Sequence, residues 1–207
     1  LVIDAALQSG VPIPHYCYHP ALGNPGNCRM CVVEVEGASK PMVSCRLPVK
    51  EGLVVKSDSP AAARAQTSAL ELHLINHPLD CPVCDQSGEC GLQDYYMAIG
   101  RYPSEVRQDK LHKGKRIEAG SHVMLDQERC ILCTRCTRFT EQVTKTNELG
   151  VFGRGHQEYV DLAPGKVLDN AYSGNVVDIC PVGALTDRDF RFKVRVWYLE
   201  ETPSICP

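Results

Sequence analysis

The stretch HPLDCPVCDQSGEC, residues 77–90, places one histidine and three cysteines within fourteen positions. Its cysteines are Cys81, Cys84 and Cys90, and His77 stands four positions before the first of them. Three kinds of chemistry use such a set: a disulfide framework, a zinc site, or an iron–sulfur cluster with one unusual ligand. The remaining cysteines of the chain distinguish among these three.

The chain has twelve cysteines in 207 residues, well above average but below the density of small disulfide scaffolds. They form three sets with two isolated positions: Cys17, Cys28, Cys31 and Cys45; Cys81, Cys84 and Cys90; Cys130, Cys133 and Cys136; then Cys180 and Cys206. Two thiolates at a C-x-x-C spacing bind one metal centre from a tight turn, and this spacing recurs four times. Because structural disulfides seldom use it, the pattern indicates metal binding.

Composition and the ends of the chain limit the function classes. A hydrophobic fraction of 43% with 23% charged residues is typical of a folded protein, and a net charge of −3 argues against nucleic-acid binding. No apolar run approaches the roughly 20 residues that cross a bilayer, so direct membrane insertion is not expected. Leu1 is not an initiator Met, no signal peptide is present, and Pro207 directly follows a cysteine, so we expect a segment of a longer chain.

Local patterns predict a mixture of short strands and helices. Residues 1–10 read as an amphipathic helix, whereas residues 31–37 and 52–57 alternate like strands. A helix is expected from Ser59, as N-cap, to near His77, where Pro78 stops it. Residues 101–116 read as a polar, basic connector, and residues 191–203 alternate like another strand.

The first set has the pattern C-x10-C-x2-C-x13-C, formed by Cys17, Cys28, Cys31 and Cys45. Plant-type [2Fe–2S] ferredoxins use C-x4-C-x2-C with a distant fourth cysteine, so the central spacing agrees while both outer gaps differ. Gly26 and the polar turn around it allow backbone amides to reach sulfur, which stabilises an anionic cluster. This set favours a [2Fe–2S] cluster, with a four-cysteine zinc site as the alternative.

The third set, CILCTRC at residues 130–136, has the C-x2-C-x2-C opening of a bacterial [4Fe–4S] ferredoxin. In two-cluster ferredoxins that run continues with x3-C-P, but Thr140 stands at that cysteine's place. A Cys-Pro pair occurs instead at Cys180 and Pro181. The simplest interpretation is half of a two-cluster module, in which Cys180 joins the three local cysteines around one cube.

Two arginines accompany this third set. Arg135 and Arg138 either offset the negative charge of a cluster or belong to an ordinary solvated helix face. Zinc is disfavoured here, because the third cysteine of C-x2-C-x2-C falls outside a single tetrahedral site.

The opening stretch supplies three cysteines and needs a fourth ligand. His77 lies one helical turn before Cys81 and is favoured, while His73 is a more remote rival. Asp80 would offer a hard carboxylate, which matches iron–sulfur chemistry poorly. Zinc bound by three cysteines and one histidine remains an alternative for this stretch considered alone.

Taken together, the motifs resemble the N-terminal region of the large iron–sulfur subunit (the G subunit) of NADH:quinone oxidoreductase, respiratory complex I. The resemblance is carried by HYCYHPALG (15–23), CRMCVVEVEG (28–37), NHPLDCPVCDQSGECGLQD (76–94), ERCILCTRCTRF (128–139), SGNVVDICPVGAL (173–185) and EETPSICP (200–207). It implies a [2Fe–2S] cluster on Cys17, Cys28, Cys31 and Cys45, a [4Fe–4S] cluster on His77, Cys81, Cys84 and Cys90, and another on Cys130, Cys133, Cys136 and Cys180.

The resemblance also implies an α+β fold in four units. Residues 1–56 would form a plant-type ferredoxin-like β-grasp domain without its N-terminal strands, and residues 57–118 a helical domain with the His-ligated cube and a connector. Residues 119–190 would form the half-ferredoxin domain. Residues 191–207 would begin a truncated domain resembling molybdopterin oxidoreductases. There, Cys206 is either a ligand of a further [4Fe–4S] cluster completed beyond residue 207 or a free cysteine.

The implied function is an electron relay from a flavin and NADH-binding subunit towards quinone-side iron–sulfur subunits. The chain would belong to an oxidoreductase complex without holding a substrate site, flavin or molybdenum cofactor of its own, and no Rossmann glycine fingerprint is present. Its place would be the peripheral arm on the cytoplasmic face of a bacterial inner membrane, in preference to the mitochondrial matrix side. Alternatives are the electron-transfer region of an NAD-linked hydrogenase or formate dehydrogenase, disfavoured by Thr140, and a zinc-stabilised interaction module.

Overall fold

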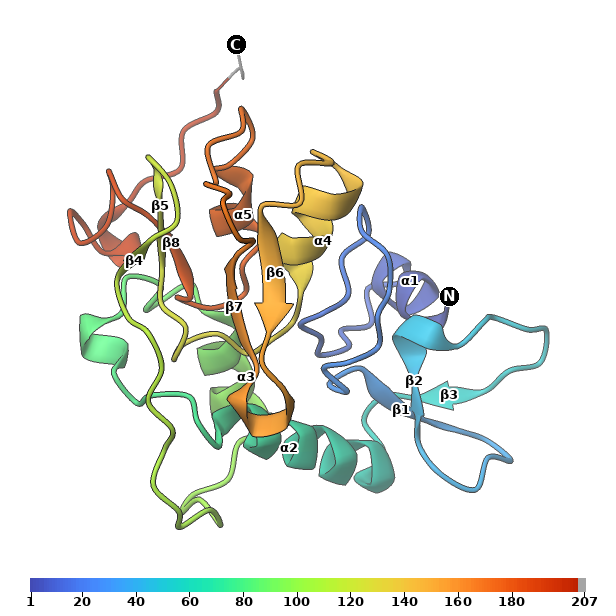
Figure 1. Ribbon diagram of the computed structural model, residues 1–207. Coiled ribbons are helices and arrows are strands. Elements are labelled where there is room, and N and C mark those ends of the chain that lie inside the picture. The colour runs from blue at the N-terminus through green and yellow to red at the C-terminus, as the bar shows by residue number, and fades with distance from the viewer. Residues whose placement is uncertain (205–207) are drawn as a thin grey trace.

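A computed structural model describes residues 1–204 as an α+β fold of three small antiparallel sheets and short helices (Figure 1). The α+β class expected from the sequence is therefore confirmed. Cys206, with the end of the expected 191–207 unit, lies outside the described residues. None of the helices within residues 1–204 combines the length and apolar character needed to cross a membrane.

The N-terminal part combines one helix with a three-stranded sheet of order β2-β1-β3. Its elements are α1 (Val2–Gln8), β1 (Val32–Val35), β2 (Met42–Val43), the 3-10 turn η1 (Ser44–Arg46) and β3 (Val55–Lys56). The β-branched valines of β1 suit a pleated surface, and Val33 and Val35 pair with Met42 and Val55. Here the predicted helix and both predicted strands are confirmed.

The middle part is helical. It contains α2 (Pro60–Leu74), the 3-10 turn η2 (Cys81–Val83) and α3 (Gly91–Ile99), and α2 packs against both β1 and α3. The Ser59 side chain accepts a hydrogen bond from the Ala62 amide at 3.2 Å, as expected of an N-cap. From the connector, Lys110 Nζ donates to the carbonyls of Leu74 and Ile75 at 2.7 and 3.0 Å, which satisfies the C-terminal end of α2.

The third part surrounds the remaining cysteines with two sheets and two helices. One sheet has the order β4-β5-β8, the other pairs β6 with β7, and α4 packs on β6 and α5 (Figure 1). The elements are β4 (Ile117–Glu118), β5 (Val123–Leu125), α4 (Arg135–Gln142), β6 (Leu149–Phe152), η3 (Gly155–Gln157), β7 (Tyr159–Leu162), α5 (Asn175–Asp178) and β8 (Leu185–Asp187).

The prediction of a strand within residues 191–203 is wrong. The segment instead forms turns and the 3-10 helix η4 (Val196–Tyr198), and it joins none of the sheets of residues 1–204. Phe192 has a positive φ of 62°, and its amide donates to Asp85 Oδ1 at 2.7 Å. The Arg195 guanidinium donates to the carbonyls of Cys84 and Pro82. Contacts with the 81–88 loop therefore take the place of strand pairing.

A single buried core links all three parts of the chain. It contains Tyr16, Cys17, Cys28, Met30, Ala69, Leu70, Cys90, Leu92, Ile131, Cys133, Val182 and Ala184. Cysteines from each of the three sets therefore belong to one continuous apolar interior. Cys31 and Cys45 lie in a second core with α1 and β1, and Cys136 lies in a third with Phe139 and Leu125.

Candidate metal centres

The first cysteine set comes together although its members are up to 28 residues apart. Cys17, Cys28, Cys31 and Cys45 are all buried, and none of them is in a disulfide. The neighbouring thiols of Cys28 and Cys45 lower the pKa of Cys17, and the thiol of Cys45 likewise lowers the pKa of Cys31. Four interacting thiols in an apolar interior form a set of soft ligands.

The loop that carries this set points backbone amides at sulfur. The amide of Cys17 donates to Cys28 Sγ at 3.4 Å. Arg29 and Gly26 adopt positive φ angles of 59° and 71°, which curl the segment around Cys28. In the turn that follows Gly26, backbone hydrogen bonds from Asn27 and Cys28 help to lower the pKa of Cys17, because amide donors directed at sulfur stabilise a thiolate.

The third set also comes together, including the remote Cys180. Cys130, Cys133, Cys136 and Cys180 line one small cavity of about 20 Å³, closed by apolar side chains of β5, β7 and β8. Burial raises the pKa of Cys130 and Cys133 to about 12 each. A thiol in such surroundings becomes a thiolate only beside a compensating positive centre, which a bound metal supplies.

Backbone geometry prepares this third site. The Leu132 amide donates to Cys130 Sγ at 3.4 Å, and Leu132 and Thr134 both adopt positive φ angles. These left-handed residues separate the three cysteines of the run, so the chain turns around the cavity before α4 begins. Thr140 is fully buried in α4, and its hydroxyl donates to the Thr137 carbonyl at 3.0 Å.

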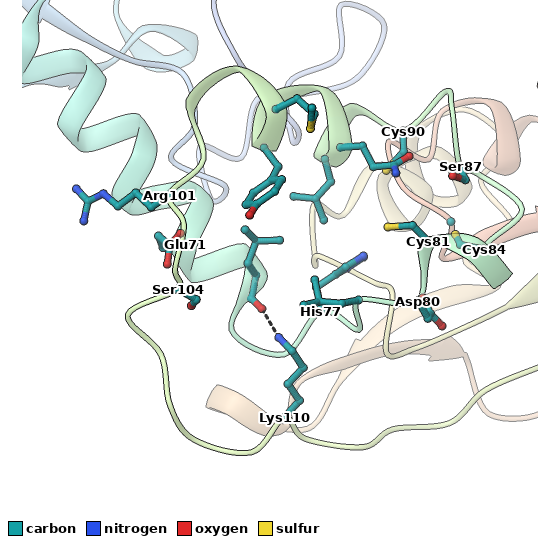
Figure 2. A pocket seen from close by; sticks show the side chains of 17 residues that line it. Glu71, His77, Asp80, Cys81, Cys84, Ser87, Cys90, Arg101, Ser104 and Lys110 are labelled. Carbon is teal, nitrogen blue, oxygen red and sulfur yellow. Dashed lines mark hydrogen bonds between the residues drawn. The ribbon is translucent and has the colours of Figure 1, made fainter. Parts of the chain in front are cut away.

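The opening stretch lines a larger cavity. This cavity of about 320 Å³ is bordered by His77, Cys81, Cys84 and Cys90 together with Leu74, Leu92 and Tyr96. Figure 2 shows the histidine and the three cysteines gathered at one end of it, with Glu71, Arg101 and Ser104 at the other. Gly183 closes the cysteine end, and a Cβ added there would lie 2.3 Å from Cys84 Sγ. The role of Gly183 was not predicted. In the sequence, only its position shortly after the Cys-Pro pair points to a role in the site.

His77 has the properties of a ligand without a partner. Its Nδ1 is buried and forms no hydrogen bond with any of the described residues (1–204), which is costly for a polar atom unless something else binds it. Burial lowers the pKa of His77 to about 4, so its imidazole is neutral at physiological pH, as metal coordination requires. The residues present therefore fit a metal cluster with one nitrogen ligand.

The rival residues are engaged elsewhere. His73 makes a 3.0 Å hydrogen bond through Nε2 with the Cys28 carbonyl and packs edge-on against Tyr16. Asp80 accepts from Arg129 Nε at 3.2 Å and from Arg129 Nη2 at 2.7 Å. Within residues 1–204 no three His, Cys, Asp or Glu side chains are arranged to share a single metal ion. The members of the second and third sets instead stand around cavities.

An ion-pair network holds the opening stretch against the third part of the chain. Arg129, whose side chain is 4% exposed, bridges Asp80 and the Val83 carbonyl, and Lys115 contacts Asp80 and Glu128. Arg129 was not identified from the sequence, because nothing in its neighbourhood indicates the remote partner Asp80.

We predict that Asp80→Asn destabilises the protein. Asp80→Asn removes the carboxylate that accepts two hydrogen bonds from Arg129 and leaves Asp126, 3.6 Å away, as the remaining negative partner, so the loss costs about 2 kcal/mol. For a chain of this length, that is a fall of about 4–8 °C in the thermal midpoint. Circular dichroism of the iron-loaded protein, with iron content measured on the same samples, checks this result. Asp189→Asn is the matched control, because its pair with His122 is exposed on both sides; equal midpoints for both variants would contradict the prediction.

Arg135 and Arg138 are not solvated helix charges. Arg138 is 8% exposed, and its guanidinium donates to the carbonyls of Cys17 and Gly23. Arg135 donates through Nη2 to the Tyr18 carbonyl at 2.7 Å and through Nη1 to the Ile179 carbonyl at 3.3 Å. Both side chains of α4 therefore fasten the third set to the loop of the first set.

Three family models match successive parts of the chain. Residues 1–60 match a 2Fe-2S iron–sulfur cluster binding domain, and residues 66–104 match the NADH-ubiquinone oxidoreductase-G iron–sulfur binding region. Residues 120–186 match the ferredoxin-like domain of NADH-quinone oxidoreductase subunit 3. The chain thus contains one 2Fe-2S binding region followed by iron–sulfur regions of the 4Fe-4S type.

Whole-chain relatives agree with these matches. The NADH-quinone oxidoreductase G subunit of Streptomyces coelicolor is 47% identical over 208 residues, which is 100% of this chain and 25% of that protein. The mitochondrial NADH dehydrogenase [ubiquinone] iron–sulfur protein 1 of Solanum tuberosum is 46% identical, over 99% of this chain and 28% of that protein. The chain thus spans about a quarter of the length of these relatives.

A solved structure supports the same assignment of fold. A chain of an NAD+-reducing [NiFe]-hydrogenase in the H2-reduced state superposes with a TM-score of 0.81 at 36% identity. The match covers 94% of this chain and 83% of that one. Because the Streptomyces coelicolor and Solanum tuberosum relatives are 46–47% identical over at least 99% of this chain, the chain belongs to the family of the iron–sulfur region of the NADH-quinone oxidoreductase G subunit.

Proposed function

We propose that the chain relays electrons within an NADH:quinone oxidoreductase, through one [2Fe–2S] and two [4Fe–4S] clusters. The single observation that carries this proposal is the shared core, which contains Cys17 and Cys28, Cys90 and Cys133. Because residues from all three sets pack in one apolar interior, an electron could pass between neighbouring clusters without crossing solvent.

The proposed ligands are the four members of each set. Cys17, Cys28, Cys31 and Cys45 would hold the [2Fe–2S] cluster; His77, Cys81, Cys84 and Cys90 one [4Fe–4S] cluster; and Cys130, Cys133, Cys136 and Cys180 the other. The corresponding domains are residues 1–56, 57–118 and 119–190, with a further domain resembling molybdopterin oxidoreductases beginning at 191–207. Cys206 stays a candidate ligand of an additional cluster, and no flavin or molybdenum cofactor is proposed.

Iron–sulfur clusters supply reversible one-electron chemistry when bound, and this chain's residues would set their surroundings. Backbone amides of Cys17 and Leu132 donate to sulfur, which favours the charged thiolates. Apolar side chains around Cys130 and Cys133 exclude water. Arg129 and Asp80 fix the loop between His77 and Cys84, so that ligands stay in place as charge changes.

The proposed partners are the flavin and NADH-binding subunit on the donor side and iron–sulfur subunits on the quinone side. The names of the relatives support this, since they are subunits of NADH-quinone and NADH-ubiquinone oxidoreductases. The proposed location is the peripheral arm of that complex, on the cytoplasmic face of a bacterial inner membrane. In this setting the chain serves an enzyme without holding a substrate site.

Two other functions have weaker support from the sequence and the comparisons. An NAD-linked hydrogenase or formate dehydrogenase is favoured by the hydrogenase neighbour, but its 36% identity is below the 47% of the complex I relative. A zinc-stabilised module would fit the cysteine content alone.

Metal analysis tests the proposal against the zinc module. Protein prepared without oxygen is assayed for iron, acid-labile sulfide and zinc. About ten irons and ten sulfides per chain are expected from the three clusters. Stoichiometric zinc without iron or sulfide would overturn the relay function.

A further inference from the structure

We propose that Arg138 is a positioning residue that joins the proposed [2Fe–2S] site to the four-cysteine [4Fe–4S] site and places a fixed positive charge between them. This inference rests on the proposed function, because it assumes that both sites carry clusters. In this proposal, the charge of one side chain affects the potentials of two neighbouring clusters of the relay.

The three guanidinium nitrogens of Arg138 contact residues of both sites. Nη2 donates to the Cys17 carbonyl and Nη1 to the Gly23 carbonyl, both in the loop of the first set. Nε donates to Thr134 Oγ1 at 3.3 Å, and Thr134 lies between Cys133 and Cys136. One rigid, planar group therefore connects the backbone of a proposed [2Fe–2S] ligand to the cysteine run of the other site.

Among residues 1–204, the charge of this group has no carboxylate partner. Arg138 is 8% exposed, and the ion pairs found within residues 1–204 leave it out. Its hydrogen-bond acceptors are two carbonyls and a hydroxyl, all of them neutral. A buried guanidinium stays charged and needs negative charge nearby. The thiolates and clusters on its two sides are the groups available to supply it.

A fixed positive charge stabilises the added electron on either cluster, so it raises both midpoint potentials. Arg138→Gln keeps hydrogen-bond donors but removes the charge. We expect this variant to shift the reduction equilibrium of both clusters about tenfold towards the oxidised form, which is about 59 mV for one electron. The His77 site lies outside the Arg138 contacts, so its cluster should keep its potential. Arg138→Lys keeps the charge and should leave all three potentials near those of the original protein.

The experiment is a redox titration of the iron-loaded protein followed by electron paramagnetic resonance. Arg188→Gln is the matched control, because it removes an arginine that also donates to a carbonyl, that of Gly120, but whose other partner is Glu118 and not a residue of either cysteine loop. A joint tenfold shift in Arg138→Gln, absent from Arg188→Gln, supports the proposal. Unchanged potentials in Arg138→Gln would overturn it.

If Arg138→Gln does not assemble its clusters, the cluster potentials of Arg138→Lys test the proposal instead. Retained potentials in the lysine variant support the charge-based role, and a tenfold fall for both clusters overturns it. Either outcome is distinct from failure of the proposed function, in which the unaltered protein would show no iron–sulfur signals to titrate.

Discussion

Removing iron from the protein with a chelator is expected to unfold the chain, not merely to bleach it. The sheets are short, with strands of two to four residues, and the cores contain the cysteines themselves. Without metal, each set leaves thiols in a largely apolar interior, and the second and third sets also border cavities. Metal binding supplies on the order of 10 kcal/mol in small structural sites, comparable to the whole stability of a domain, about 5–15 kcal/mol.

Far-UV circular dichroism and thermal melting before and after chelation check this expectation. The iron-free chain should lose its cooperative thermal transition, and reconstitution with iron and sulfide without oxygen should restore it. Reconstitution is the control that separates metal loss from irreversible damage. An iron-free protein that keeps the spectrum and the cooperative melting of the loaded form would contradict the result.

The second large effect is expected from His77→Ala, which should leave one [4Fe–4S] cluster labile. His77 Nδ1 is the buried, unpartnered nitrogen at the cavity that Cys81, Cys84 and Cys90 also line. Losing it leaves three protein ligands, so about four irons per chain should be lost on brief exposure to air while the other two clusters persist. Iron analysis and electron paramagnetic resonance of the purified variants measure this loss.

His73→Ala is the matched control, because this histidine sits one turn earlier in the chain but bonds to the Cys28 carbonyl. It should retain all three signals. His77→Cys should retain the cube with a lower potential, because a thiolate adds a negative charge that a neutral imidazole lacks. Loss of the cube in His73→Ala, with an unaltered spectrum in His77→Ala, would mean that the wrong histidine has been assigned.

Spacing in the sequence was enough to group the cysteines, and the structure brings each group together. Even Cys180, 44 residues beyond Cys136, lines the same cavity as the 130–136 run. Such grouping is possible from spacing because soft-ligand motifs demand fixed local spacing, and because the Cys-Pro pair is typical of the end of a ferredoxin cysteine run. The α2 boundaries were also predictable, since an N-cap serine and a following proline act locally.

Features set by contacts distant in sequence could not be predicted. The interpretation of Arg135 and Arg138 stayed open, because their carbonyl partners lie more than 100 residues away at Tyr18, Cys17 and Gly23. The 191–203 segment alternates like a strand but contacts the 81–88 loop instead of pairing with a strand, and alternation alone does not reveal which partner is present. The position of His77 relative to Cys81 already favoured it over His73, and the structure adds that His73 bonds to the Cys28 carbonyl.

The central claim is that three clusters lie in one chain and exchange electrons, and a reductive titration observed by electron paramagnetic resonance tests it most directly. Protein prepared without oxygen is reduced stepwise, and the spins are counted at each potential. We expect one [2Fe–2S] signal and two [4Fe–4S] signals, integrating to about three spins per chain at full reduction, with magnetic interaction between neighbouring clusters. A fully reduced, metal-replete protein that shows no such signals, or only one isolated cluster, would contradict it.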